Sequence, residues 1–143
     1  MARGIPQEVI RHFQAVPLFQ SVSKKGIRAI VAAATEVDVP AGKVFLREGE
    51  FGRELYVVLG GEALVTKAGT RLSTMGPGDF FGELAFLDGS TRTATVAART
   101  DMRVMVLGPR EFDGIVQREP AIAKRLLETM ARRIRQNERA VNL

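Results

Sequence analysis

The middle of the chain, residues 35–107, alternates short apolar stretches with turns built around glycine. The clearest turns are Gly60-Gly61, Ala68-Gly69 and Gly76-Pro77-Gly78. Turns at this spacing end each strand after a few residues, and many short strands in a row favour a β-sandwich or a barrel. We predict strands at residues 36–39, 44–46, 55–59, 62–66, 71–75, 93–98 and 103–107.

Two helices are predicted before this region, within residues 6–34. Apolar residues recur there at helical spacing, and Ser23 is placed to cap the start of the second helix. The stretch Val16-Pro17-Leu18-Phe19 should separate the two, because proline disfavours helix in the residue before it. The β-region is therefore expected to begin after a helical N-terminal segment.

Two more helices are predicted after the strands, within residues 109–139. Pro109 occupies a first helical position and Pro120 opens a second, longer helix. Apolar residues that recur every four positions form one stripe on this longer helix. The stripe consists of Ile122, Leu126, Met130 and Ile134. We expect it to pack on the strands or on a partner.

Length and composition indicate one domain, residues 1–143, in a reducing compartment. The chain has 143 residues and no cysteine, so disulfides and thiolate chemistry are excluded. Residues 1–8 lack the apolar core of a signal peptide, and no run is apolar enough to span a membrane. We therefore expect a cytoplasmic protein without membrane insertion.

The stretch from residue 81 to residue 96 contains the residue types that are best suited to binding a ligand. It contains Phe-Gly-Glu-Leu-Ala-Phe-Leu, a small-residue loop, and then Arg-Thr-Ala-Thr-Val. Gly82 lets the backbone approach a ligand, and free N–H groups at the start of a helical turn favour an anion. Arg92 offers a planar fork to phosphate oxygens, whereas the Glu83 carboxylate can only accept, as from a hydroxyl. Donors for one phosphate beside an acceptor for a sugar hydroxyl describe a cyclic nucleotide.

This stretch resembles the phosphate-binding cassette of the cyclic nucleotide-binding domain family. That family includes the catabolite activator protein, regulatory subunits of cyclic-nucleotide-dependent kinases, and cyclic-nucleotide-gated channels. Its pattern, F-G-E-[hydrophobic]-[small], a loop, then R-[T/S/A]-A-[T/S]-[hydrophobic], is met at every fixed position, and the resemblance extends from Gly42 to Arg133. It implies a mainly β protein with flanking helices, a β-jelly-roll at residues 35–107 and a cassette at residues 81–96.

The resemblance also implies a role for each cassette residue. Glu83 should accept a hydrogen bond from the ribose 2′-hydroxyl, and Arg92 should pair with the cyclic phosphate. Backbone N–H groups should complete the phosphate cradle. The residues expected at this end of the ligand are Phe81, Gly82, Glu83, Leu84, Ala85, Arg92, Thr93 and Ala94.

The base should meet an apolar wall on the strands. Val65 and Met75 lie on strands that the family turns toward the ligand, and Ser73 can supply a hydroxyl. The alternative for Val65 and Met75 is ordinary core packing. Arg133, in the last helix, aligns with a position that reaches over the base in some relatives, and Asn137 follows one turn later. A solvated arginine is the alternative for Arg133.

Thr93 bears on the choice between cyclic AMP and cyclic GMP. Threonine here often accompanies acceptance of cyclic GMP in the family, although some members that prefer cyclic AMP carry it too. Its hydroxyl could reach the phosphate or a guanine amino group, or the residue could simply favour a strand. We favour cyclic AMP as the ligand and keep cyclic GMP open.

Catalytic and metal sites are disfavoured by what the chain contains. His12 is its only histidine, so a jelly-roll metal site built on a histidine cluster cannot form, and we expect no metal. A G-x-S-x-G elbow is absent. The glycines at positions 76, 78 and 82 are spaced one residue too far for a dinucleotide fingerprint. We therefore predict a binding protein rather than an enzyme.

The charge pattern does not favour direct contact with nucleic acid. The formal net charge is +5, and part of it lies in the last helix. A nucleic-acid or membrane patch is one interpretation. A solvated helix face is preferred, because acidic residues alternate with the basic ones and no aromatic residues interleave for stacking.

The resulting hypothesis is a cyclic nucleotide sensor that signals by moving its C-terminal helices. The signal would reach an effector protein or domain that contacts the last helix. We expect a monomer or a weak homodimer. The alternatives are a regulatory fragment of a larger channel or kinase, and a transcription regulator, which would need a helix-turn-helix beyond residue 143.

Overall fold

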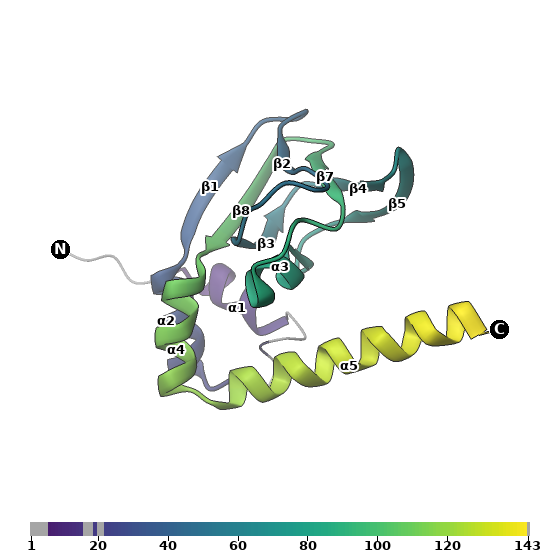
Figure 1. Ribbon diagram of the computed structural model, residues 1–143. Coiled ribbons are helices and arrows are strands. Elements are labelled where there is room, and N and C mark those ends of the chain that lie inside the picture. Colours follow the sequence, from purple (N-terminus) through teal and green to yellow (C-terminus); the bar gives the residue numbers. More distant parts are fainter. Residues whose placement is uncertain (1–5, 16–18, 20–21, 143) are drawn as a thin grey trace.

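A computed structural model describes residues 6–15, 19 and 22–142 of the chain, shown in Figure 1. Inside its helices, the description leaves out the side chains of Glu83, Leu87, Leu126, Thr129, Arg133 and residues 136–142. The helices are α1 (Gln7–Ala15), α2 (Lys24–Ala33), α3 (Glu83–Asp88), α4 (Pro109–Arg118) and α5 (Ala121–Asn142). The strands are β1 (Thr35–Val39), β2 (Val44–Leu46), β3 (Leu55–Gly60), β4 (Ala63–Lys67), β5 (Thr70–Met75), β6 (Phe80–Phe81), β7 (Thr95–Ala98) and β8 (Met102–Leu107).

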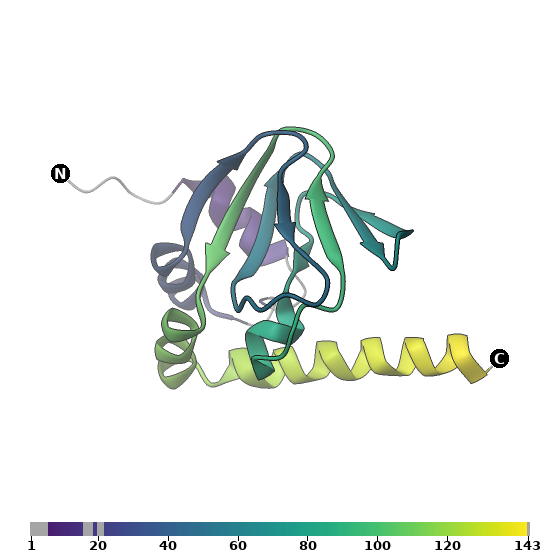
Figure 2. The ribbon, with the colours of Figure 1, turned by 45° about the horizontal axis from the view of Figure 1, so that its top comes forward.

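The strands form two antiparallel sheets that face each other. One sheet has the order β1-β8-β3-β6 and the other has the order β2-β7-β4-β5. Sequence neighbours such as β1 and β2 lie in different sheets, as a jelly-roll requires, and the helices flank the strands (Figures 1 and 2). The predicted fold class, a mainly β jelly-roll with flanking helices, is confirmed.

The core has two parts because β3 and its neighbour β8 are buried on both faces. Leu55 and Val57 of β3 belong to a cluster shared with α1, α2 and α4. Val58, on the opposite face of the strand, belongs to a second cluster between the two sheets. Successive side chains of a strand point to opposite faces, which explains the division. Burial of each such side chain contributes about 1.5–3 kcal/mol.

The ends of the flanking helices follow the predicted sequence signals. The Ser23 hydroxyl accepts a hydrogen bond from the Gly26 N–H at 3.0 Å, so Ser23 is the N-cap of α2 as predicted. Pro109 occupies the first turn of α4, also as predicted. The break predicted around Pro17 lies outside the described residues, except for Phe19.

The predicted strands differ from the structure in one strand that was not predicted and in one start that is two residues too early, and the other bounds agree to within one residue. Residues 80–81 form the short strand β6, whose Phe81 pairs with Tyr56 of β3, and no strand is predicted there from the sequence. Strand β7 begins at Thr95 rather than at residue 93. The Arg92 N–H donates to the Glu50 carbonyl at 2.8 Å, so this segment pairs with a loop before it joins the sheet.

The last helix leaves the body of the protein. Helix α5 starts beside α4, where Ile122 is fully buried, and then extends beyond the strands (Figure 1). Met130 still packs against the core, but Ile134 is 57% exposed and Leu127 is 69% exposed. Of the predicted stripe, Ile122 and Met130 therefore pack on the body, whereas Ile134 does not, and the expectation that a partner covers the remainder stays a prediction.

Candidate functional site

Gly82 joins strand β6 to helix α3 in a backbone conformation that few other residues adopt. Its φ is +88°, in the left-handed region. A Cβ atom at this position would lie 2.7 Å from the Glu54 carbonyl oxygen and 3.0 Å from Nη1 of Arg92. The Phe86 N–H donates to the Gly82 carbonyl at 3.1 Å, the first bond of the helix. The N–H groups of Glu83, Leu84 and Ala85, which come before Phe86, therefore have no carbonyl partner within the helix and point outward from its N-terminal end.

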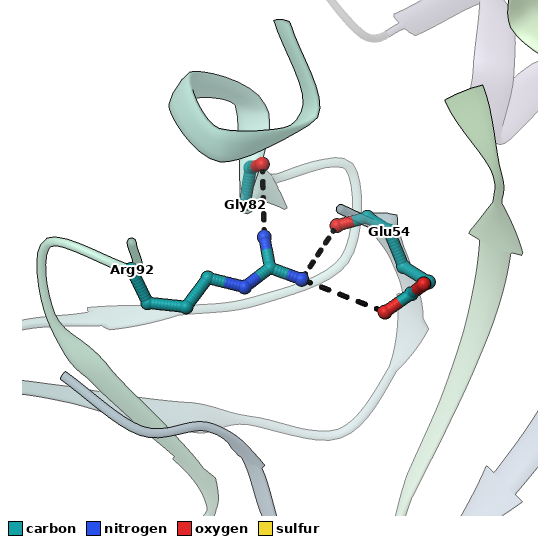
Figure 3. Close-up of polar contacts among 3 residues, drawn as sticks. All are labelled: Glu54, Gly82 and Arg92. Atoms are coloured by element: carbon teal, nitrogen blue, oxygen red, sulfur yellow. Dashed lines mark hydrogen bonds and ion pairs between the residues drawn. The ribbon is translucent and has the colours of Figure 1, made fainter. Parts of the chain in front are cut away.

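Arg92 lies against this turn and is only 5% exposed. Its Nη1 donates to the Gly82 carbonyl at 3.2 Å, and its Nη2 donates to the Glu54 carbonyl at 3.1 Å (Figure 3). Nη2 also lies 3.7 Å from Oε1 of the Glu54 carboxylate. A buried cation needs such partners, because the loss of hydration would otherwise outweigh its contacts. These bonds fix the plane of the guanidinium.

The electrostatic surroundings of Arg92 reflect its burial. Loss of hydration lowers the pKa of the Arg92 guanidinium, whereas Tyr56 and Glu54 raise it. The pKa of Tyr56 is raised by burial and then by the Glu54 charge. Tyr56 stacks on Phe81 with ring centroids 5.0 Å apart. Arginine remains charged at neutral pH, so the protein holds a fixed cation beside the start of α3.

A cavity of about 460 Å³ opens in front of these groups, within the usual range for small-molecule sites. We call it the cassette cavity. It is lined by Leu46, Val65, Leu72, Ser73, Met75, Phe81, Gly82, Leu84, Ala85, Arg92, Thr93, Ala94 and Val96. Arg92 and the start of α3 supply donors, and strands β4 and β5 supply an apolar wall with one serine hydroxyl. The cavity can thus take a ligand with an anionic end and a flat apolar end.

Most residues predicted for the site line the cassette cavity. Those placed there are Phe81, Gly82, Leu84, Ala85, Arg92, Thr93, Ala94, Val65, Ser73 and Met75. The side chains of Glu83, Arg133 and Asn137 lie outside the described residues, so their predicted contacts stay predictions. No described residue of α5 lines the cavity.

Sequence reasoning missed four residues of the site. Leu46, Leu72 and Val96 line the cavity without having been predicted. Glu54 was missed too, although it supplies two of the three contacts of Arg92 shown in Figure 3. Regular alternation along β5 places residue 72 on the opposite face from Ser73, so no pattern pointed to it. For Glu54, which contacts Arg92 partly through its backbone carbonyl, the sequence holds no signal.

The loop between α3 and Arg92 is closed by local hydrogen bonds. Gly89, with φ of +71°, ends α3, and its N–H donates to the Ala85 carbonyl at 2.8 Å. The Asp88 carboxylate accepts from the Ser90 hydroxyl at 2.6 Å and from the Ser90 N–H at 2.9 Å. These two bonds lower the pKa of Asp88, chiefly through the hydroxyl. The loop thus sets the distance between α3 and Arg92.

A second cavity, of about 660 Å³, lies between α1 and the start of β8. We call it the α1 cavity. Its ionisable lining residues include Glu8, Asp38 and Asp101, while Arg103 is ion-paired to Asp38 at 3.6 Å. Its larger volume does not make it the better anion site, because a phosphate there would meet carboxylates. The cassette cavity has a buried arginine and no described carboxylate in its lining.

The described part of the chain offers neither a cluster of metal-ligand residues nor a helix suited to a membrane. Among residues 6–15, 19 and 22–142, no group of three or more histidine, cysteine, aspartate or glutamate residues could hold a metal ion. None of the described helices is both long and apolar enough to cross a membrane.

Residues 36–119 match a family model described as the cyclic nucleotide-binding domain. The chain is similar to a cyclic nucleotide-gated potassium channel of Rhizobium etli, with 34% identity over 89% of this chain and 36% of the channel. It is also similar to a CRP-like cAMP-activated global transcriptional regulator of Mycobacterium tuberculosis, with 31% identity over 82% of this chain and 55% of the regulator. The chain thus spans about a third to half of these relatives.

Solved structures share the fold. The catabolite activator protein of Thermus thermophilus has a TM-score of 0.82 and 27% identity, over 88% of this chain and 62% of that one. The regulatory domain of Toxoplasma gondii PKA with cAMP has a TM-score of 0.77 over 88% of this chain and 49% of that one. At 21% identity, this second likeness concerns the fold alone.

Proposed function

Because the chain belongs to the cyclic nucleotide-binding domain family, we propose that its cassette cavity binds a cyclic nucleotide, with cyclic AMP preferred over cyclic GMP. The observation that carries this proposal is the position of Arg92. Its guanidinium is buried and fixed beside the start of α3, in the wall of a cavity of about 460 Å³. A planar cation together with free backbone N–H groups is suited to a phosphate.

The proposed binding mode follows the two ends of the cavity. The cyclic phosphate meets Arg92 and the N–H groups of Leu84 and Ala85, and Glu83 accepts from the ribose 2′-hydroxyl. The base lies against the strand wall formed by Val65, Ser73, Met75 and Leu72. A cyclic phosphate carries one negative charge and leaves the ribose 2′-hydroxyl free. The ligand therefore needs hydrogen-bond donors around its phosphate and one acceptor for its hydroxyl.

Calorimetric titration with both nucleotides tests the proposal. We expect one site per chain for cyclic AMP, weaker binding of cyclic GMP, and much weaker binding of linear 5′-AMP. Arg99→Ala provides a matched control, because Arg99 is an exposed arginine paired with Glu62 away from the cavity. Absence of heat and of any thermal shift with either cyclic nucleotide at high concentration would contradict the proposal.

We further propose that the chain acts as a sensor whose output is the position of α5. The exposed Leu127 and Ile134 support this, since an apolar helix face free of the body can be covered by another surface. Helix α5 and the β4–β5 hairpin extend from the same side of the molecule (Figures 1 and 2), so the helix can approach the base end of the cavity. The ligand must bind one helix position better than the other, or it shifts nothing.

Hydrogen exchange with and without cyclic AMP tests the sensor mechanism. We expect the ligand to slow exchange over residues 121–137, and truncation after Thr129 to weaken binding while the cassette stays folded. Equal protection of residues 121–137 in both states would overturn the sensor mechanism and leave the ligand assignment intact.

The wider context is proposed from the relatives. The chain covers 36% and 39% of two channel relatives and 55% of a transcriptional regulator. We propose binding without turnover of the nucleotide, in a module that regulates a partner or a larger channel, kinase or transcription regulator. A chromatographic assay of cyclic AMP after long incubation tests the absence of turnover, and any linear product formed would contradict it.

A further inference from the structure

Glu54 places a negative charge on the far side of Arg92 from the cassette cavity. Its Oε1 lies 3.7 Å from Nη2, and its side chain is 49% exposed while that of Arg92 is 4% exposed. Arg92 lines the cavity and Glu54 does not. Among the described residues, the ionisable groups that act on Arg92 are Tyr56 and Glu54, and burial keeps the pKa of Tyr56 above its ordinary value, so Tyr56 is neutral. A ligand phosphate would therefore meet a cation that is already paired with an anion.

This pairing changes how the site responds to ligand charge. A lone guanidinium attracts a doubly charged phosphate about twice as strongly as a singly charged one, because Coulomb energy is proportional to charge. A carboxylate behind the guanidinium repels the ligand, and that repulsion also doubles with the second charge. The second charge therefore gains less than it would at a lone guanidinium, while the N–H donors that Arg92 does not use on the Gly82 and Glu54 carbonyls remain available to either ligand.

We propose that Glu54 is a specificity-determining residue, which makes the site select singly charged phosphodiesters over doubly charged phosphomonoesters. Cyclic nucleotides belong to the first class, and the far commoner 5′-nucleotides belong to the second. The inference rests on the proposed function, because it concerns the same cavity. It assigns to Glu54 a contribution to the discrimination against doubly charged nucleotides, in addition to the orientation of Arg92 by its carbonyl.

Glu54→Gln isolates the charge from the shape of the site. Glutamine keeps the backbone carbonyl that Nη2 binds at 3.1 Å and keeps a side-chain oxygen that can accept. Only one negative charge is removed. Because the Glu54 side chain is 49% exposed, a dielectric near that of water applies, and a singly charged ligand roughly 7 Å away should bind about threefold more tightly once the charge is removed. A doubly charged ligand should then gain about the square of that factor, roughly tenfold.

Three adenine ligands provide the comparison at one pH. Cyclic AMP and adenosine 5′-(methyl phosphate) carry one negative charge, and 5′-AMP carries two at about pH 8, above its second phosphate pKa of about 6. The methyl ester differs from 5′-AMP by one methyl group, so the pair separates charge from the linear shape. Weak ligands are measured by their displacement of cyclic AMP from the wild-type chain and from Glu54→Gln.

Two further variants serve as controls. Glu62→Gln removes the same unit charge from an exposed glutamate, paired with Arg99 at 3.3 Å, and should leave the ligand ratios unchanged. Glu54→Asp keeps the charge and shortens the side chain, so its ratio of 5′-AMP to methyl ester affinity should stay near the wild-type value. Thermal melting of each variant confirms that it is folded.

The result that supports the inference is a selective gain for 5′-AMP in Glu54→Gln, about threefold larger than the gain for cyclic AMP and for the methyl ester. An equal change for all three ligands, or a general loss of affinity, would overturn the role of charge and leave cyclic nucleotide binding in place. Failure of the wild-type chain to bind cyclic AMP would overturn the proposed function itself and this inference with it.

Discussion

Arg92 donates from Nη1 to the carbonyl oxygen of Gly82 at 3.2 Å, so the buried cation and the turn that starts α3 are held together. This contact joins the two groups that would meet a phosphate, the guanidinium and the N–H groups at the start of α3. The left-handed φ of Gly82, +88°, turns its carbonyl toward Arg92, and the absence of a side chain leaves room for the guanidinium.

Removal of the Arg92 side chain should weaken cyclic AMP binding by roughly 30-fold or more, because loss of a partner from a desolvated charged contact costs about 2–5 kcal/mol. Glu83→Ala should cost less, since it loses a hydroxyl contact. Calorimetry on Arg92→Ala and on the control Arg99→Ala measures the difference. A folded Arg92→Ala protein with near-native affinity would show that the cavity has been assigned to the wrong ligand.

Gly82→Ala should destabilise the protein more than Gly78→Ala. Both glycines have positive φ, +88° and +90°, so alanine at either costs about 1–2 kcal/mol. Only at Gly82 would the added Cβ meet other atoms, the Glu54 oxygen at 2.7 Å and Nη1 at 3.0 Å, which adds about 1–3 kcal/mol. Urea unfolding of the two variants checks the order, and equal losses of stability would contradict the close packing at Gly82.

Thr93→Ala tests how the base is selected. Thr93 is exposed and lines the cassette cavity. If its hydroxyl serves the guanine amino group, the substitution should lower cyclic GMP affinity more than cyclic AMP affinity. Titrations of Thr93→Ala and of Thr74→Ala, an exposed threonine outside the cavity lining, provide the comparison. Equal losses for both nucleotides would assign Thr93 to the phosphate or to packing.

The Asp88–Ser90 contact should appear as a pH dependence. Because the pKa of Asp88 is lowered in the folded protein, chiefly by the Ser90 hydroxyl, the contact stabilises the fold above the unfolded pKa of about 3.9. That stabilisation is lost as the pH falls through the lower, folded pKa. Ser90→Ala should raise the pKa of Asp88 toward its ordinary value. NMR titration of the carboxyl carbons measures it, and an unchanged Asp88 pKa would disprove the role of the hydroxyl.

Much of the fold could be predicted because its strands are bounded by glycine turns. Residues Gly60-Gly61 and Gly76-Pro77-Gly78 end strands where expected, and Ser23 and Pro109 start helices where expected. Strand β6 was not predicted because two residues are too few to show the alternation of apolar and polar side chains that marks a strand. The jelly-roll arrangement itself came from the family resemblance, since periodicity alone does not say which strands pair.

The site could be predicted where the residue type itself indicates a role in binding, as with Gly82 and Arg92. It was not predictable where function depends on contacts between distant segments. Glu54 lies 38 residues before Arg92 and binds it partly through a backbone carbonyl that every residue possesses. The spacing of apolar residues in the sequence predicted the stripe on α5. Spacing alone does not show whether Ile134 packs on the body of the protein. That depends on where the helix axis points after α4.

The most direct test of the central claim is an NMR titration of the isotopically labelled chain with cyclic AMP, following backbone amides. We expect saturable shifts with one site per chain, largest at residues 82–85 and 92–94 and present along β4 and β5, with α1 unchanged. In Arg92→Ala the same shifts should need far more ligand. Shifts that instead gather around Glu8 and Asp101 in the α1 cavity, or no saturable shifts at all, would contradict the assignment of the cassette cavity as the cyclic nucleotide site.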